Sequence, residues 1–358
     1  MKFYMPTRLY VEEECVLSHN KELSSLGQKA LIVTGKSSAI KSGAFDDVAK
    51  ALSTNNVAYC VFNEVEENPS TDTIIKATTY GLAENVDFVI GIGGGSPLDA
   101  AKAIAFMLNL KSTDPKDLYN PTLPSNALPI AAIPTTCGTG SEVTGVSVLT
   151  VHDKQTKSSI PQRIFPQLAL VDGKYLMNAP HAMIVNTSID ALAHMIESLL
   201  SKKNDQFSQS NALTGITLWS YTKKVLTKEK PLDSANAFQL MLSSTFGGLA
   251  IAQTGTSIPH ALSYILTYDQ HIPHGKACGY FLGKFLREAP FDLQYPTLCA
   301  AGFTKIEDFQ SFLQTVFGDF SVPSETLERA YNVVVKNKER LNGCRFDVDE
   351  ETLRRIVF

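Results

Sequence analysis

The chain has 358 residues, of which 44% are hydrophobic and 19% charged, and its formal net charge is −4. This length exceeds what one hydrophobic core comfortably holds, so two domains are expected. The composition is that of a globular protein, and the weak acidity gives no reason to expect binding to nucleic acid or to an anionic membrane. No stretch approaches 18 uninterrupted apolar residues, so no membrane span is expected.

The N-terminal sequence and the spacing of the cysteines bear on the cellular compartment of the protein. The first six residues contain no apolar segment typical of a secretory signal. The six cysteines are scattered without Cys-x-x-Cys spacing, which favours reduced thiols over a disulfide framework or a zinc finger. We therefore expect a cytoplasmic protein.

Short apolar runs alternate with helical patterns in the first half of the chain. Strands are predicted at residues 29–34, 57–62, 86–92, 129–133, 145–151 and 168–171. Helices are predicted at residues 46–52, 71–84 and 97–110. This alternation is typical of a mostly parallel sheet in a doubly wound, Rossmann-like α/β domain, which we expect to span residues 1–178.

After Pro180 the hydrophobic period changes to that of helices. Residues 184–200 carry apolar side chains at helical spacing. Similar patterns occur at residues 211–226, 235–253, 306–317 and 324–337, and alternating β-branched runs are nearly absent. We therefore expect residues 179–358 to form an all-helical domain.

A glycine-rich turn, Gly93-Gly94-Gly95, follows the third predicted strand. We interpret Ser96 as the N-cap of the next helix, Pro97 as its first residue and Asp99 as the partner in a capping box. Bare backbone amides beside a helix N-terminus bind phosphate. The turn can also be purely structural, but a second segment rich in Thr and Gly, residues 134–142, also follows a strand and favours a nucleotide site.

The turn after the first predicted strand bears on the choice of cofactor. An acidic residue here would bind the ribose 2′-hydroxyl and repel a 2′-phosphate. This chain has Gly35, Lys36, Ser37 and Ser38, which offer one ammonium, two hydroxyls and no carboxylate. The turn therefore favours NADP(H) over NAD(H), the alternative being an exposed turn without this role.

Four side chains suggest a metal site. Asp190 and His194 are spaced to share one face of a helix, and His260 and His274 follow downstream. Three imidazoles and one carboxylate suit a divalent transition metal. We interpret Glu197, on the same predicted helix, as a solvated side chain.

Five segments together resemble the iron-containing (group III) alcohol dehydrogenase family. They are Gly93–Lys102, Pro134–Thr144, Asp190–Glu197, Pro259–Ala261 and Pro273–Gly275. The resemblance implies the architecture shared with dehydroquinate synthase, a Rossmann-like parallel-sheet domain followed by an all-helical domain. The resemblance runs from about residue 28 to about residue 280, and the residues after that carry no motif of the family.

The resemblance also implies roles for individual residues. Asp190, His194, His260 and His274 would hold the metal. The cofactor would lie against Gly94, Gly95, Ser96, Asp99, Thr135, Thr136, Thr139, Ser141 and Lys157, the last near the nicotinamide ribose. Cys137 stands where the family usually has alanine. Relatives often have a histidine four residues after the ligand at 260, where this chain has Tyr264. We interpret Tyr264 as a wall of the pocket and His271 as a loop residue near its mouth.

The chemistry of the site favours iron. Four protein ligands already fill a tetrahedron, whereas a catalytic zinc typically keeps three and an open position. We therefore expect Fe(II), with zinc as the alternative. The expected enzyme (EC 1.1.1.-) transfers a hydride between NADP(H) and a small alcohol or aldehyde, and the metal polarises the substrate oxygen. A homodimer is compatible with this reading.

Three alternatives stay open. The first is a polyol, glycerol-type dehydrogenase that uses NAD and zinc on the same fold. The second is a non-redox metal lyase, disfavoured because the metal-binding segments are poor in Lys and Arg. The third is an oxygenase with two histidines and one carboxylate, which would leave the nucleotide motifs without a role.

Overall fold

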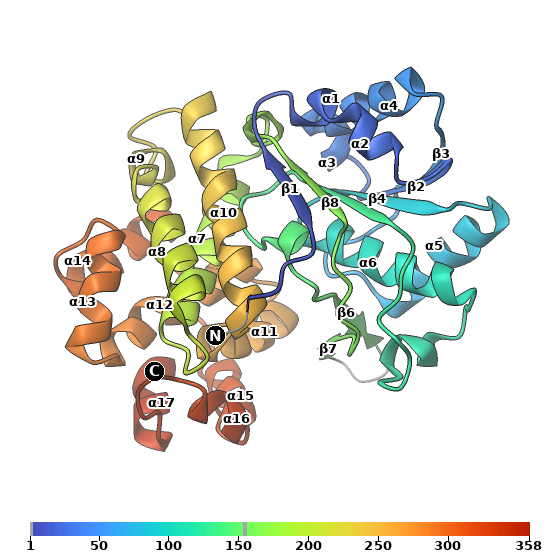
Figure 1. Ribbon diagram of the computed structural model, residues 1–358. Coiled ribbons are helices and arrows are strands. Elements are labelled where there is room, and N and C mark those ends of the chain that lie inside the picture. The colour runs from blue at the N-terminus through green and yellow to red at the C-terminus, as the bar shows by residue number, and fades with distance from the viewer. Residues whose placement is uncertain (1–2, 153–155) are drawn as a thin grey trace. The chain divides into compact units, whose positions relative to one another are not determined.

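The computed structural model describes residues 3–152 and 156–358 and divides into two compact units (Figure 1). The α/β unit contains residues 5–136 and 140–179. The helical unit contains residues 3–4, 137–139 and 180–358. The short segment at residues 137–139 thus groups with the helical unit, although it lies among the residues expected in the α/β domain.

The α/β unit is built on a six-stranded parallel sheet with the order β1-β8-β5-β4-β2-β3. These strands are β1 (Arg8–Val11), β2 (Lys29–Thr34), β3 (Ala58–Phe62), β4 (Phe88–Gly93), β5 (Ile130–Pro134) and β8 (Leu168–Val171). A separate antiparallel pair joins β6 (Val148–Val151) and β7 (Thr156–Ser159). The sequence did not predict β1, because this edge strand has no fully buried residue and so no strong apolar signal.

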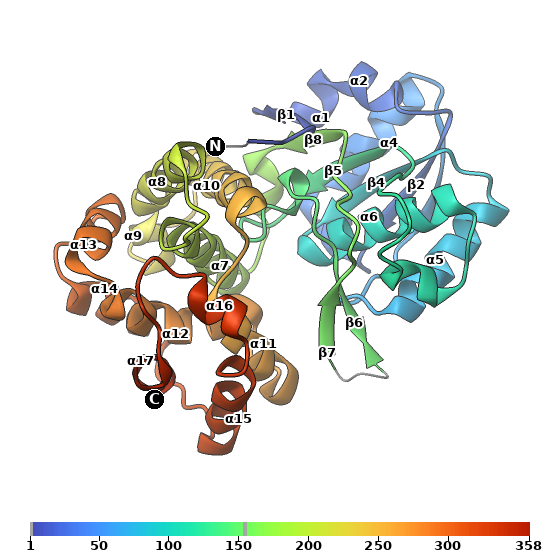
Figure 2. The same cartoon turned by 60° about the horizontal axis from the view of Figure 1, so that its bottom comes forward.

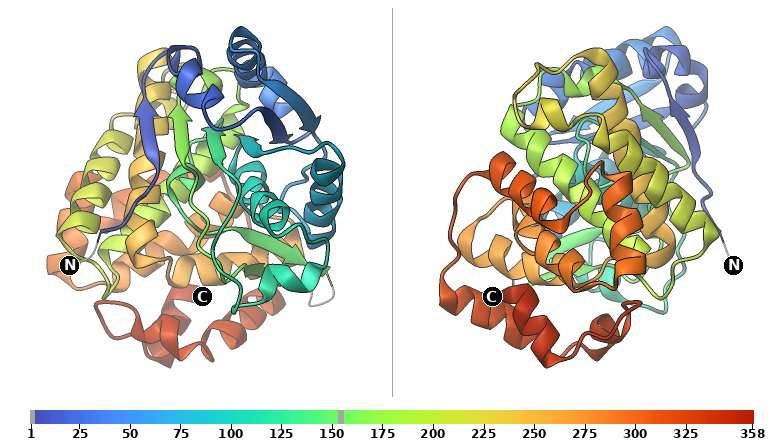
Figure 3. Two further views of the ribbon diagram at one scale, coloured as in Figure 1. Left: turned by 45° about the vertical axis from the view of Figure 1, so that its right-hand side comes forward. Right: turned by 90° about the vertical axis from the view of Figure 1, so that its left-hand side faces the viewer.

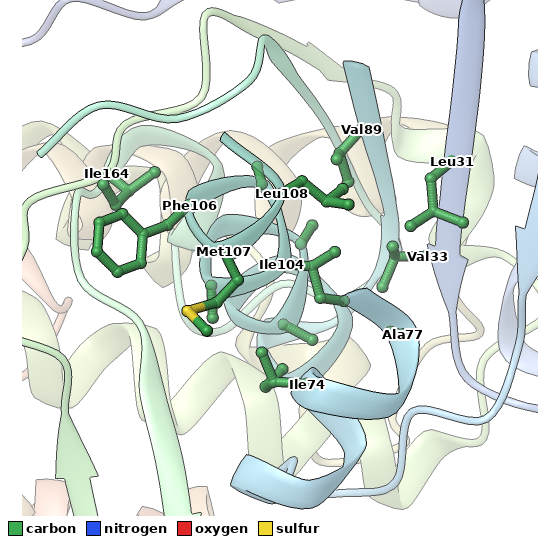
Figure 4. Packing of buried hydrophobic residues seen from close by; sticks show 14 of the residues in the cluster. Leu31, Val33, Ile74, Ala77, Val89, Ile104, Phe106, Met107, Leu108 and Ile164 are labelled. Carbon is green, nitrogen blue, oxygen red and sulfur yellow. The ribbon is translucent and has the colours of Figure 1, made fainter. Parts of the chain in front are cut away.

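Helices cover both faces of the parallel sheet (Figure 1). One face carries α1 (Cys15–Ser18), α2 (Asn20–Ser24), α3 (Ser38–Ser42) and α4 (Ala44–Thr54). The other carries α5 (Thr71–Ala83) and α6 (Gly95–Leu110). A hydrophobic core lies on each face of the sheet, and alternate residues of β2 point into one or the other. Ile32 packs on the first face, whereas Leu31 and Val33 pack towards α5 and α6 (Figure 4). Burial of both faces explains why the strands read as continuous apolar runs.

The helical unit contains no strand among its described residues, apart from one isolated bridge. Its helices are α7 (His181–Leu199), α8 (Gln206–Ser220), α9 (Lys223–Leu226), α10 (Ser234–Thr254), α11 (Ile258–Gln270), α12 (His274–Glu288), α13 (Phe291–Ala300), α14 (Ile306–Phe317), α15 (Ser324–Val334), α16 (Lys338–Asn342) and α17 (Glu350–Val357). Helix α7 packs against α8, α10 and α12 (Figures 2 and 3), and every residue from Ser188 to Leu199 is buried. The unit is therefore assembled around α7.

The structure corrects several predicted boundaries. The helix predicted over residues 211–226 is two helices, because α8 ends at Ser220 and α9 begins at Lys223. The strand predicted from residue 145 begins at Val148. The 3-10 helices at Pro115–Tyr119, Ser141–Val143 and Gly173–Leu176 were not predicted. Within the described ranges, no helix has both the length and the apolar character needed to cross a membrane.

A buried lysine ties the segment after β5 to α6. Lys102 is fully buried, and its Nζ donates to Ser141 Oγ at 2.6 Å and to the Val146 carbonyl at 2.8 Å. Nζ also lies 3.5 Å from a carboxylate oxygen of Asp99. Burial lowers the pKa of Lys102, and the Asp99 charge opposes that shift. These contacts fix the 3-10 helix Ser141–Val143 against α6.

We expect Lys102→Met to destabilise the protein. The change leaves Asp99 without its cation, which costs about 2–3 kcal/mol, below the range for a fully buried pair because 16% of the Asp99 side chain is exposed. The measurement is urea unfolding followed by circular dichroism. Lys50→Met, at an exposed position of α4, is the control and should change the free energy of unfolding little. A loss below about 1 kcal/mol in Lys102→Met would contradict the proposed role of this pair.

Candidate metal centre and nucleotide site

Helix α7 carries the first two predicted metal ligands on one face. Asp190 and His194 lie one turn apart and are 4% and 5% exposed. Nε2 of His194 is 4.0 Å from Oδ1 of Asp190. Because α7 is central to the helical unit, this carboxylate is placed deep inside a packed core.

The N-terminal turns of α11 and α12 bring the other two histidines to the same oxygen. Nε2 of His260 lies 3.3 Å from Asp190 Oδ1, and Nε2 of His274 lies 3.6 Å from it. The rings of His194 and His260 stack with centroids 4.4 Å apart. The structure thus brings together the four side chains that the sequence suggested, with Asp190 at their centre.

The outward-facing nitrogen of each imidazole has its own neighbour. Nδ1 of His194 lies 3.2 Å from the carbonyl oxygen of Gly138, which can only accept a hydrogen bond. Ser263 Oγ donates to the His260 carbonyl and lies 3.4 Å from Nδ1 of His274, so its lone pair can accept from that nitrogen. With Nδ1 donating, Nε2 carries the lone pair that a metal needs, and it faces Asp190.

Glu197 corrects the sequence interpretation, because it is fully buried and not solvated. It lies two turns after Asp190 on α7 and accepts hydrogen bonds from the backbone N–H groups of Ser257 at 3.0 Å and His260 at 2.9 Å. Its Oε2 is also 2.7 Å from Nδ1 of His260. One carboxylate therefore caps the N-terminus of α11 and lies as a charged neighbour beside the outward nitrogen of the His260 ring, although that contact lacks the geometry of a hydrogen bond. Glu197 follows His194 by three residues, and this spacing could have indicated that it lies on the face of α7 that carries the metal ligands. The spacing could not show that the N-terminus of α11 packs against this carboxylate.

The electrostatics of this cluster fit a cation. Neither Oδ1 of Asp190 nor either ring nitrogen of His260 makes a hydrogen bond of good geometry within the described part of the chain. Burial by itself raises the pKa of Asp190, but the surrounding imidazoles outweigh it and hold the pKa below its ordinary value. Burial lowers the pKa of His194 to about 4, so this ring is neutral at neutral pH and able to bind a metal. A buried carboxylate surrounded by three imidazoles is a donor set that suits a transition metal.

Tyr264 and Cys278 lie beside the cluster, and His271 lies in the turn that precedes His274. The Tyr264 ring stacks on His274 with centroids 5.7 Å apart and an interplanar angle of 13°. His271 is the exposed C-cap of α11, in the turn that leads to His274. Cys278, one turn after His274 on α12, is buried beside the ligands and was not anticipated from the sequence.

The candidate nucleotide site lies at the carboxyl ends of β2, β4 and β5 in the α/β unit. The register pairs Thr34 with Ile92 and Gly93 with Pro134, so the three turns that follow these strands start side by side. From β2 the chain moves outward to β3, whereas from β4 it moves the other way to β5. Such a switch point at the carboxyl ends of a parallel sheet is where nucleotides bind.

The start of α6 differs from the prediction. The N-cap is Gly94 and not Ser96, so the helix begins at Gly95. The Ser96 hydroxyl instead accepts a hydrogen bond from the backbone N–H of Asn68 at 3.0 Å. Asp99 forms no capping box: its carboxylate accepts from Ser141 Oγ at 2.5 Å and from the Val148 N–H at 2.9 Å. The earlier start leaves the amides of Gly95 and Ser96 in the first helical turn, where they can face a phosphate.

The turn after β2 is open to a ligand. Lys36 and Ser37 are exposed, and Gly35 and Ser38 are half-buried. A Cβ on Gly35 would lie 3.3 Å from the Val65 carbonyl oxygen, so only a small side chain with a slight backbone adjustment fits.

The remaining predicted cofactor residues have varied surroundings. The Thr135 N–H donates to the Gly93 carbonyl at 2.9 Å, which joins two of the turns. A Cβ on Gly94 would lie 3.0 Å from the Thr136 hydroxyl, so the two residues are in close contact. Lys157 donates to the Asn68 side chain at 2.7 Å. Thr139 groups with the helical unit, and its role toward the cofactor stays a prediction.

The chain matches a known enzyme family over most of its length. A family model described as iron-containing alcohol dehydrogenase matches residues 6–173. A second, for the C-terminal part of the Fe-containing alcohol dehydrogenase family, matches residues 184–331.

Individual relatives agree with this match. The crystal structure of an iron-containing alcohol dehydrogenase from Thermotoga maritima is 34% identical, with a TM-score of 0.90, over 99% of this chain and 98% of that one. A long-chain-alcohol dehydrogenase from Geobacillus thermodenitrificans is 28% identical over 94% of this chain and 90% of its own. An NADPH-dependent butanol dehydrogenase from Clostridium saccharobutylicum is 29% identical over 77% and 70%.

We expect Glu197→Gln to weaken metal binding about 10- to 100-fold, as for other residues that orient a metal-binding histidine. A glutamine can donate its amide N–H to Nδ1 of His260, which favours the tautomer with the proton on Nε2. That tautomer has no lone pair for the cation. The measurement is competition between zinc-loaded protein and a chelator of known affinity.

The matched control is Glu325→Gln, at an exposed position of α15, which should leave metal affinity unchanged. Equal metal affinity in Glu197→Gln and the unaltered protein would show that this carboxylate does not set the His260 tautomer.

Proposed function

The chain belongs to the iron-containing alcohol dehydrogenase family, and on this premise we propose that it is a metal-dependent oxidoreductase that exchanges a hydride between NADP(H) and a small primary alcohol or its aldehyde. The observation that carries the proposal is the convergence of three imidazole Nε2 atoms on the buried Asp190 carboxylate. Names of relatives, such as long-chain-alcohol and butanol dehydrogenase, support an alcohol as substrate, and the second of them supports a small one.

The residues of the helical unit would hold and orient a divalent cation. Asp190, His194, His260 and His274 supply the donors. When bound, the cation polarises the oxygen of the alcohol or aldehyde, while the nicotinamide exchanges the hydride. The His274 side chain is 27% exposed, far more than the other three donors, so a substrate oxygen has most room on its side. Four protein donors and a substrate favour Fe(II), with zinc as the alternative.

In the α/β unit, the first turn of α6 would bind the cofactor pyrophosphate through the amides of Gly95 and Ser96. The neighbouring turn, Gly35 to Ser38, would read the adenosine ribose. Its exposed Lys36 ammonium and serine hydroxyls suit a 2′-phosphate and are the basis for proposing NADP(H).

The decisive test measures turnover and metal content together. NADPH and NADH oxidation is followed with aldehydes, and the reverse reaction with 1-alkanols, diols and glycerol. We expect the highest specificity constants with a primary alcohol and its aldehyde. A preference for glycerol with NAD would favour the polyol dehydrogenase instead.

Removal of the metal should abolish turnover. We expect one transition-metal ion per chain, and no activity after exhaustive chelation or in His260→Ala and His274→Ala. Both variants should keep the circular dichroism spectrum of the folded protein. Full activity in either variant, or after chelation, is incompatible with the proposal.

Tyr264→Phe should retain most of the turnover. The ring stacks on His274, and phenylalanine preserves that contact, so the substitution removes only the hydroxyl. The expected change is in substrate preference, measured as the ratio of specificity constants for short and long aldehydes. A loss of kcat beyond about a thousandfold would instead identify the hydroxyl as a general acid or base.

Gly35→Asp should reverse the cofactor preference. The new carboxylate repels the 2′-phosphate and can accept a hydrogen bond from a 2′-hydroxyl. Charge-assisted contacts are worth about 1.5–3 kcal/mol each, so the NADPH to NADH ratio of kcat/KM should fall about ten- to hundredfold. The ratio is measured at saturating aldehyde.

Lys36→Ala tests the same turn without adding a carboxylate. It should raise KM for NADPH more than KM for NADH, because it removes only the ammonium. The exposed Lys50→Ala serves as control for a general effect of surface charge. A preference of the unaltered enzyme for NADH, or the same ratio in Gly35→Asp, would show that this turn does not read the 2′ position.

A further inference from the structure

Cys278 lies within reach of the metal centre. The carboxylate of Asp190, one imidazole nitrogen each from His260 and His274, and Sγ of Cys278 all lie within 4.8 Å of one another. The thiol is fully buried. His194, in contrast, has the longest separation from Asp190 Oδ1 of the three imidazoles.

His274 and Cys278 have the same four-residue helical spacing as Asp190 and His194. Cys278 follows His274 by four residues on α12, so the two side chains share one helix face. Two helices therefore each present a pair of donors one turn apart, and α11 adds His260 between them. Together they offer a carboxylate, three imidazoles and a thiol.

The packing of α12 on α7 directs this helix face inward. A Cβ on Gly275 would overlap the backbone carbonyl of Asn186 on α7. A Cβ on Gly279 would overlap the ring of Phe317 on α14 and would also lie 3.1 Å from Ile189, the residue beside Asp190. Gly275 thus lets α12 approach α7 closely, and Gly279 leaves room for Phe317; the approach of α12 brings Sγ to the carboxylate.

The distances are those of ligands around one ion. Sγ of Cys278 is 3.8 Å from Nε2 of His274. Two donors on a tetrahedral zinc, with Zn–S of about 2.3 Å and Zn–N of about 2.0–2.1 Å, lie about 3.6 Å apart. Asp190 Oδ1 and His260 Nε2, both buried and without a well-directed hydrogen bond in the described chain, point into the same space.

We propose that Cys278 adds a thiolate ligand to the cation held by Asp190, His194, His260 and His274, and that this thiolate shifts the preference of the centre from Fe(II), which the oxygen and nitrogen donors alone favour, toward zinc. Thiolate is a soft ligand that favours zinc, whereas carboxylate and imidazole discriminate less between the two ions. The inference rests on the proposed metal-dependent function, since it adds a donor to that centre.

Cobalt substitution tests the inference spectroscopically. The metal is removed from the full-length protein and replaced by one equivalent of Co(II) without oxygen. We expect visible d–d bands and a near-ultraviolet thiolate-to-cobalt charge-transfer band in the unaltered protein. Cys278→Ser should keep the d–d bands and lose the charge-transfer band. Cys344→Ser, which alters another fully buried cysteine that lies beside Ser257 Oγ, is the matched control and should keep both.

The outcomes separate this inference from the proposed function. Cobalt bound with d–d bands but no charge-transfer band in the unaltered protein overturns the role of Cys278 and leaves the proposed function intact. No cobalt binding at all overturns the metal centre, and the inference with it. A charge-transfer band that survives in Cys278→Ser also overturns the assignment.

X-ray absorption of the zinc-loaded, unaltered protein decides the same point without any variant. A sulfur neighbour at about 2.3 Å supports the inference, and a shell of only nitrogen and oxygen at about 2.0–2.1 Å overturns it. Zinc affinity of Cys278→Ser should fall at least about tenfold, since even partners outside the coordination shell contribute that much, and iron affinity should fall less. An equal fall in the affinities for zinc and iron overturns the proposed preference for zinc.

Discussion

The helical unit depends on one costly interaction, the burial of the Asp190 carboxylate in the middle of a helix bundle. A buried carboxylate needs compensating charge and hydrogen bonds, and here the compensation comes from imidazoles on three helices. Their outward nitrogens lie beside Gly138, Glu197 and Ser263. The proposed divalent cation would complete this arrangement, because it would satisfy the carboxylate and the imidazoles at once.

Close helix packing gives the centre its geometry. Helix α12 approaches α7 at Gly275, where a side chain would overlap the Asn186 backbone, and accommodates the Phe317 ring of α14 at Gly279. Helix α11 is anchored by the Glu197 carboxylate, which takes the place of a side-chain N-cap that Ser257 does not provide. Ligands near helix N-termini are thereby held on rigid backbone, which a metal centre with a defined ligand set requires.

The α/β unit has the features needed to bind the proposed anionic cofactor, although the protein has no excess of positive charge. Parallel pairing sets three turns side by side at the carboxyl ends of β2, β4 and β5. Gly93, with φ of 149°, and Gly94, close to Thr136, allow the backbone to turn into α6 without side chains in the way. Backbone amides and a helix N-terminus then supply the local positive potential that the overall composition lacks.

The sequence by itself determined the class of each unit and indicated four candidate metal donors, because periodicity and motif spacing are local. The strand at residues 29–34 and the helix at 306–317 were predicted with their observed bounds, and Asp190 and His194 follow from helical spacing alone. Only the tertiary structure decided which groups from other helices reach them. From the sequence alone, Glu197 was interpreted as a solvated residue and Cys278 was given no role. Their burial beside the histidines becomes visible only in the structure, where α11 and α12 pack on α7. Side-chain burial and contact depend on residues more than sixty positions apart, and no local pattern records them.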